Sequence, residues 1–162
     1  MKFRIIYIGK DKKNHHSDAE KLYLKRLKNY VAIELVQLKP EKYSKSLSAT
    51  EVKAKEAKIF EKELGANSRV ILLDENGKQY DSMGFSKFME QQTNLGGRVV
   101  NFVIGGAYGF SDMMKDKYKT KLALSSLTYA HHLARLVLLE QIYRAMTILN
   151  NCLLYTSPSP RD

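Results

Sequence analysis

Three short segments carry residue types that could hold a ligand, and each follows an apolar run. They span residues 72–74, 105–109 and 124–129. Glycines directly after a strand let a ligand approach the backbone closely, and exposed N–H and C=O groups can read a planar heterocycle between leucine walls. If the three segments meet in space, they suit an adenine-containing ligand. In isolation, the Gly–Gly pair would more simply turn a strand into a helix.

Other sites with a recognisable sequence signature are excluded. Residues 105–109 are not the G-x-G-x-x-G of a dinucleotide site, because the second glycine directly follows the first. The sequence holds no Walker A motif, no H-E-x-x-H and no nucleophile elbow. The only cysteine, Cys152, lacks a partner in the chain, so we expect no disulfide and no metal. His15 and His16 lack nearby ligands, and we expect both to face solvent.

A long helix expected at 130–149 carries a histidine pair and two arginines. On helical geometry, His131 and Arg135 lie about 40° apart around the axis, whereas Arg135 and Arg144 lie about 180° apart. One arginine could line a crevice or RNA surface of its own subunit while the other reaches across a dimer seam. Alternatively, either arginine forms an ion pair on the helix surface, for instance with Glu140. Arg144 lies in the most apolar helix, where an unpaired charge is costly.

Alternating apolar and amphipathic stretches must position these segments. The sequence predicts strands at 2–8, 32–38, 69–73, 99–104 and, more weakly, 121–127. It predicts helices at 17–30, 50–64, 82–94 and 130–149, and a short one from residue 111. Thr50 is the expected cap of the second helix, Gly65 its stop, and Gly77 a turn. The fold class is therefore α/β, a parallel sheet flanked by helices, with its ligand crevice beyond the carboxyl ends of the strands.

The expected final helix is apolar around more than one face. Its inward stripe comprises Leu133, Leu136, Val137, Ile142, Met146 and Leu149, and the stripe is widened by Leu138, Leu139 and Tyr143. We expect such a helix to be buried on two sides. A second subunit could supply the extra cover, which predicts a homodimer.

The length of the chain limits the number of domains, and its net charge indicates the class of partner. With 162 residues, 44% of them hydrophobic, the chain can form one core, and we expect a single domain over residues 1–150. The apolar run at 5–8 ends at Gly9 and is too short for a membrane span, so we expect a cytoplasmic protein. The net charge of +10 favours a polyanion such as RNA, DNA or an acidic membrane. Many lysines, however, lie in mixed-charge helices, where they solvate a face.

Five segments together are typical of one family. They are residues 3–9, residues 70–74, Val-Ile-Gly-Gly-Ala-Tyr-Gly at 103–109, Leu-Ser-Ser-Leu-Thr at 124–128 followed by His131, and Leu-Glu-Gln-Ile-Tyr-Arg-Ala at 139–145. In order and spacing, over about residues 1–150, they resemble the RlmH family of the SPOUT superfamily. The resemblance implies an α/β fold with a C-terminal trefoil knot, a homodimer, and methylation of N3 of a pseudouridine in 23S rRNA, in the assembled ribosome, with S-adenosylmethionine as cofactor.

The resemblance also assigns residues. It places S-adenosylmethionine against Leu73, Gly105, Leu124, Ser125, Ser126, Leu127, Thr128 and Tyr129, in the same three segments. A sulfonium methyl group is already electrophilic, so the enzyme chiefly has to align the acceptor nitrogen with it. The imide proton must also leave, which a base or a positive group would help. We expect His131 to handle this proton or contact the substrate, and Arg144 of a partner subunit to anchor substrate or phosphate.

The chain departs from the family pattern at residues 151–162. Family members close with a short tail containing Tyr and His near the active site, whereas this tail has no histidine and Tyr155 is no safe substitute for the family tyrosine. We interpret the segment as an atypical, non-native tail that would impair turnover more than cofactor binding. Two other functions fit the sequence: a non-enzymatic RNA-binding or ribosome-associated factor, and a related methyltransferase acting on tRNA, which the absence of a separate RNA-recognition domain disfavours.

Overall fold

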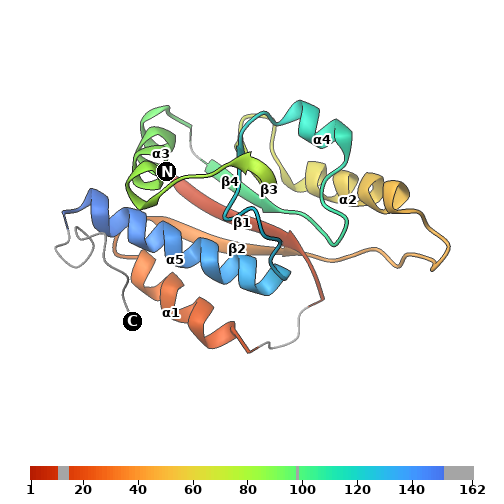
Figure 1. Cartoon of the computed structure of the whole chain (residues 1–162), viewed down its shortest axis with the longest axis horizontal. Helices are drawn as coiled ribbons and strands as arrows, with labels where there is room; N and C mark the ends of the chain where they lie inside the picture. Colours follow the sequence, from red (N-terminus) through yellow and green to blue (C-terminus); the bar gives the residue numbers. More distant parts are fainter. Residues whose placement is uncertain (11–14, 98, 152–162) are drawn as a thin grey trace.

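The computed structural model describes residues 1–10, 15–97 and 99–151. Within these ranges, five parallel strands form one sheet in the order β2-β1-β4-β3-β5, with helices on both faces (Figure 1). The strands are β1 (Lys2–Ile8), β2 (Ala32–Leu38), β3 (Arg69–Lys78), β4 (Val99–Ile104) and β5 (Lys121–Leu122). The helices are α1 (Ser17–Leu27), α2 (Ala49–Glu63), α3 (Ser82–Asn94), α4 (Asp112–Lys117) and α5 (His131–Leu149). The predicted α/β class is confirmed, whereas the predictions for Cys152 and Tyr155 lie outside the described residues.

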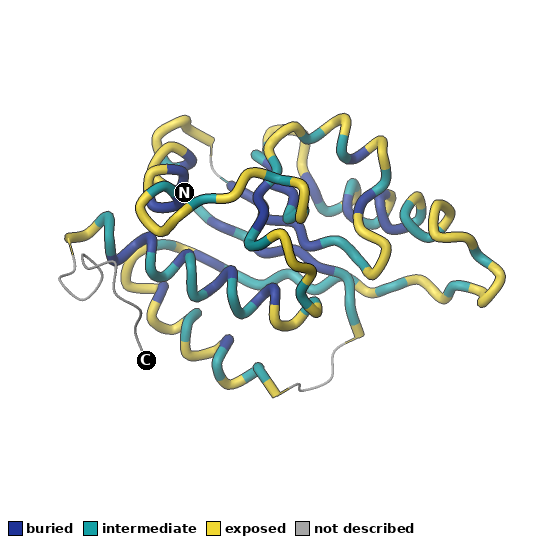
Figure 2. Tube along the Cα trace, in the orientation of Figure 1, coloured by how far each residue is buried: buried dark blue, intermediate teal, exposed yellow. Residues whose placement is uncertain are grey.

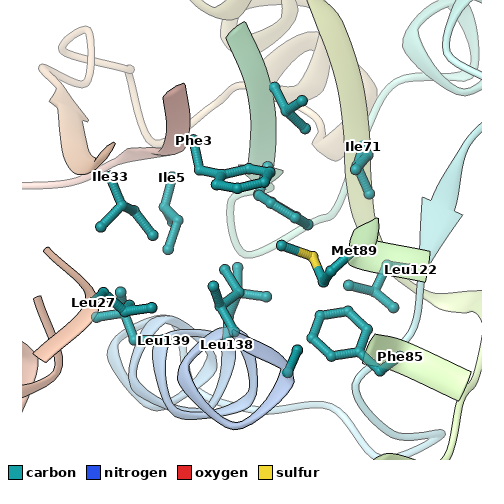
Figure 3. Close-up of a cluster of buried hydrophobic side chains, with 14 of the residues drawn as sticks. Phe3, Ile5, Leu27, Ile33, Ile71, Phe85, Met89, Leu122, Leu138 and Leu139 are labelled. Carbon is teal, nitrogen blue, oxygen red and sulfur yellow. The ribbon is translucent and has the colours of Figure 1, made fainter. Parts of the chain in front are cut away.

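The larger core lies between one face of the sheet and the helices α1, α3 and α5 (Figure 3). Alternate residues of each central strand reach it, because successive side chains of a strand point to opposite faces. Its fully buried members include Phe3, Ile5, Leu27, Ile71, Met89, Phe102, Leu138 and Leu139. On the other face, α2 and α4 cover a smaller core that contains Ile6, Phe60, Leu72, Val103 and Met114. The central strands are therefore buried on both sides (Figure 2).

The wide apolar surface of α5 is covered by other elements of the same chain. Both α1 and α3 contact this helix, one on each flank (Figure 1), while the sheet lies beneath it. Leu138, Leu139 and Ile142 are fully buried, but Leu133, predicted to point inward, is 36% exposed. That prediction is wrong because Leu133 and Ile142 lie about 180° apart around a helix and cannot both face the core. The width of the apolar surface therefore does not by itself require a second subunit.

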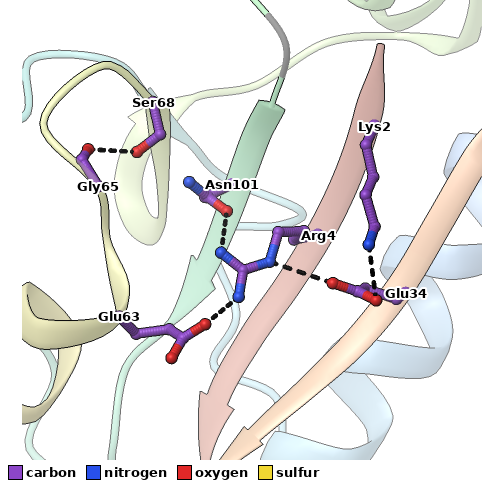
Figure 4. Close-up of polar contacts among 7 residues, drawn as sticks. All are labelled: Lys2, Arg4, Glu34, Glu63, Gly65, Ser68 and Asn101. Carbon is purple, nitrogen blue, oxygen red and sulfur yellow. Dashed lines mark hydrogen bonds and ion pairs between the residues drawn. The ribbon is translucent and has the colours of Figure 1, made fainter.

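A polar cluster fastens the sheet to the end of α2 (Figure 4). Arg4 of β1 forms ion pairs with Glu34, at 3.3 Å, and with Glu63 of α2. The same guanidinium donates to the Oδ1 atom of Asn101 at 3.4 Å, and Lys2 adds a 2.8 Å ion pair with Glu34. Asn101 is the polar interruption in the otherwise apolar β4 and is fully buried. Arg4 supplies the partner of its amide oxygen, while its Nδ2 atom is buried without a hydrogen-bond partner among the described residues.

Several predicted boundaries differ from the structure, and the helix predicted to reach residue 30 ends at Leu27. The cap of α2 is Ser48, whose hydroxyl accepts a hydrogen bond from the Glu51 N–H at 3.2 Å, and not Thr50. Gly77 lies inside β3, where a Cβ would come within 2.8 Å of the Lys121 carbonyl carbon, so close strand contact explains this glycine. The strand β5 has only two residues, and the chain from Ala123 onward leaves the sheet as a loop.

In the part of the chain that is described, no helix is both long and apolar enough to cross a membrane.

Candidate cofactor-binding site

The part of β3 that follows its pairing with β4, the carboxyl end of β4 and the loop after β5 line one cavity of about 320 Å³. All three segments singled out in the sequence contribute to it, which confirms their predicted convergence. Its walls include Leu73, Gly105, Leu124, Ser125, Leu127, Thr128, Tyr129 and His131. Ser126, expected beside them, is exposed and does not line the cavity. A cavity of this size lies in the range of small-molecule sites.

After β4, glycine occupies three positions where a side chain would be strained or crowded by neighbouring atoms. Gly109 has a φ of 77°, in the left-handed region that favours glycine, and its N–H donates to the Gly106 carbonyl at 3.0 Å. A Cβ on Gly105 would lie 3.3 Å from the Gly109 carbonyl carbon, and a Cβ on Gly106 would lie 2.8 Å from the carboxyl carbon of Glu56. The loop is therefore packed tightly behind the cavity. These glycines meet the steric needs of the loop and also line the cavity, so they do more than turn a strand into a helix.

Glu56 is a buried neighbour of the glycine loop that the sequence did not reveal. It comes from α2, is 7% exposed, and its Oε1 atom is buried without a hydrogen-bond partner among the described residues. Burial raises the pKa of this carboxyl above its ordinary value. The nearby Tyr43 hydroxyl is also buried without a partner there, and its pKa is likewise raised, first by burial and then by the charge of Glu56.

Replacing Glu56 by glutamine is expected to stabilise the protein at neutral pH. A carboxyl with a raised folded-state pKa binds more protons folded than unfolded, so wild-type stability falls as pH rises from about 4.5 through the folded pKa. Glutamine removes this dependence, and the gain at pH 7 should be on the order of 1 kcal/mol, the scale of one buried unpaired polar group.

Urea denaturation at pH 4 and pH 7 measures this effect. The exposed Glu90→Gln variant is the matched control and should show no such pH-dependent difference. A Glu56→Gln variant that loses stability at pH 7 relative to pH 4 would mean that the carboxylate is ionised and paired in the native protein.

The loop before α5 is held against the end of β3. The Thr128 hydroxyl donates to the Glu75 carboxylate, and the Ser125 hydroxyl accepts from the Leu127 N–H at 3.0 Å. Leu127 is 73% exposed although it is apolar. This side of the cavity thus combines an anchored backbone with an uncovered leucine, an arrangement suited to contact with a flat apolar ligand face.

His131 is the first residue of α5 and lines the cavity half-buried. Burial lowers the pKa of its imidazole, and the positive charges of His132 and Arg135 lower it further. The neutral ring is therefore favoured at physiological pH, which is the form that can accept a proton.

Arg135 has a structural position that neither sequence alternative foresaw. It is 6% exposed and forms an ion pair with Glu20 of α1 at 3.1 Å, while its guanidinium lies 3.9 Å from the centre of the Tyr7 ring. It is neither a crevice residue nor a partner of Glu140. Its charge is satisfied by an acid 115 residues away in the sequence, beyond the reach of helical spacing.

Arg144 is the arginine that pairs with Glu140, at 2.8 Å and on the same helix. It does not line the cavity of its own chain. His131 and Arg144 are thus not brought together at the cavity within one chain.

The first histidine pair is partly as predicted. His15 is exposed, but His16 is half-buried at the start of α1, with its ring centre 6.4 Å from that of His132. The prediction that both face solvent is wrong for His16, because α1 packs beside α5. Among the described residues, no three His, Cys, Asp or Glu side chains are grouped to hold a metal ion.

The fold is an α/β domain with a parallel sheet, and its cavity lies where a small ligand commonly binds in such domains. A family model described as "Predicted SPOUT methyltransferase" matches residues 1–153, and the chain belongs to this family. Relatives named "Ribosomal RNA large subunit methyltransferase H" occur in Parabacteroides distasonis and Flavobacterium johnsoniae, each 39% identical over 93% of this chain and 96% of the relative. The Phocaeicola vulgatus relative of the same name is 36% identical with the same coverage.

A solved structure supports the fold alone. It is that of a probable methylase family protein from Haemophilus influenzae, with a TM-score of 0.50 and 16% identity over 92% of this chain and 66% of that chain. The trefoil knot implied by the resemblance stays a prediction.

Proposed function

We propose that this chain transfers a methyl group from S-adenosylmethionine to N3 of a pseudouridine in 23S rRNA, in the assembled ribosome. The observation that carries the proposal is the single cavity formed by the three strand-end segments. Membership of the SPOUT methyltransferase family gives the reaction class, and the names of the relatives give the substrate class.

The cavity residues fit the cofactor. Gly105 and Gly106 let a flat base approach the backbone, and Leu73 and Leu124 supply apolar walls. The bound cofactor would supply an electrophilic methyl group, so the protein's own task is to align the acceptor and remove its proton. Ser126 lies outside the cavity wall and is the one assigned cofactor residue that the geometry supports least.

His131 is the proposed proton acceptor. It lies at the cavity wall, and burial keeps its imidazole neutral by lowering the pKa. The imidazole ring of His131 would accept the imide proton of the pseudouridine as N3 is methylated. Negative charge would then not accumulate on the nucleobase.

The proposed assembly is a homodimer acting on RNA in the cytoplasm. A net charge of +10 favours a polyanionic substrate, and the long-range attraction should weaken with salt. Arg144 lies outside the cavity of its own chain, so its proposed role as substrate or phosphate anchor requires a partner subunit to present it.

Mixing two inactive variants tests this shared site. We expect His131→Ala and Arg144→Ala each to impair methylation. In a two-fold dimer, each mixed dimer regains one intact site, so co-refolding the two variants should restore about a quarter of wild-type activity. No recovery, full activity of Arg144→Ala alone, or a monomer by sedimentation at micromolar concentration would contradict the composite site.

Calorimetry with S-adenosylmethionine separates the proposal from its main alternative. An enzyme should give saturable heat near one cofactor per site, whereas a non-enzymatic RNA-binding or ribosome-associated factor should give none. A methyltransferase directed to tRNA would bind the cofactor equally well and would differ only in the RNA that it modifies.

A further inference from the structure

Two oppositely charged side chains face the cavity beside the assigned segments. Asp74 follows Leu73 within β3, just after the pairing of β3 with β4 ends, and its side chain is only 9% exposed. Lys115 comes from α4, with a side chain 38% exposed. A nearly buried carboxylate and a cation at the rim thus belong to the same wall of the cavity.

The two charges form only a long ion pair, with no direct hydrogen bond between them. The Asp74 Oδ2 atom lies 3.9 Å from the Lys115 Nζ atom, which is beyond the usual hydrogen-bond range of about 2.7–3.2 Å. Asp74 accepts one hydrogen bond through Oδ1, from the Asn76 N–H at 2.9 Å. Its Oδ2 atom therefore retains acceptor capacity, and the ammonium of Lys115 retains donors for a ligand.

We propose that Asp74 and Lys115 bind the amino-acid end of S-adenosylmethionine. The inference rests on the proposed use of that cofactor. The α-ammonium would donate to Asp74 Oδ2, and the α-carboxylate would accept from the Lys115 ammonium. A zwitterion carries both charges on one carbon, so it complements a loosely spaced acid and base better than any singly charged group.

The alternative position for Asp74, against the sulfonium, fits the reaction less well. The sulfonium charge disappears during methyl transfer, so a carboxylate beside it would stabilise the ground state more than the transition state. The α-ammonium keeps its charge throughout. Asp74 and Lys115 should therefore affect cofactor affinity and KM, with little effect on kcat at saturating cofactor.

Calorimetry on the full chain tests the assignment with three ligands. They are S-adenosylmethionine, S-adenosylhomocysteine, which keeps the amino-acid end but lacks the sulfonium charge, and 5′-methylthioadenosine, which lacks the amino-acid end. Asp74→Asn and Lys115→Met should each weaken the first two ligands by roughly tenfold or more, the scale of a charged hydrogen bond. Both variants should bind 5′-methylthioadenosine as the wild type does.

Matched controls remove the same charges elsewhere. Asp116→Asn and Lys119→Met change exposed residues on the same stretch of chain and should leave all three affinities unchanged. Equal losses for all three ligands, a loss confined to S-adenosylmethionine, or no loss would each overturn the assignment. If the wild type bound none of the three, the proposed cofactor itself would be wrong, whereas wild-type binding with insensitive variants would overturn only this inference.

Discussion

Replacing Arg135 by alanine is expected to destabilise the protein by about 3–5 kcal/mol, the usual cost of breaking a buried ion pair on one side. The substitution leaves the Glu20 carboxylate, 7% exposed, without its cation. It also removes the guanidinium that lies over the Tyr7 ring and so loosens the contact of α5 with β1 and with α1. Urea denaturation followed by circular dichroism measures the change.

A double variant separates charge from packing. Glu20→Gln combined with Arg135→Met removes both charges and keeps side-chain volume, and it should recover most of the stability lost in Arg135→Ala. The exposed Lys21→Ala change on α1 is the surface control. A single Arg135→Ala variant as stable as the wild type would mean that the buried pair contributes nothing to the fold.

Replacing His131 by alanine is expected to lower the methylation rate by roughly 10²- to 10⁴-fold, the scale of one general acid–base group. The adjacent His132 is exposed, and His132→Ala is the matched control, expected to retain activity. Circular dichroism would show that both variants fold.

The pH profile gives an independent check on His131. Its neutral form is the base, so the rate should fall on the acid side as the ring becomes protonated. Because burial lowers the pKa, that fall should lie below the ordinary histidine value of 6.5. The His131→Ala variant should lose this acid limb, and a profile with an unchanged limb would assign the titration to another group.

Local sequence patterns correctly predicted the strands and the helix that are determined by residues close in sequence. The bounds of β1, β2, β4 and α3 follow from apolar runs and turn residues close in sequence, and the structure confirms them. The convergence of three segments at one cavity follows from a topological rule about parallel strands, and it is also confirmed.

Contacts between distant residues could not be predicted in the same way. The pairing of Arg135 with Glu20, and the packing of Glu56 against Gly106, join segments separated by 115 and about 50 residues. No periodicity encodes such pairs. Likewise, β5 ends after two residues and the chain leaves the sheet to line the cavity, although Ala123 and Leu124 continue the apolar run.

Mass spectrometry of ribosomal RNA tests the central proposal most directly. A bacterial strain that lacks its own enzyme of this family would be compared with the same strain carrying this gene or its His131→Ala variant. The proposal predicts a pseudouridine of 23S rRNA that gains one methyl group at N3 only with the wild-type gene. An unchanged methylation pattern in 23S rRNA, with the protein expressed and folded, would contradict it.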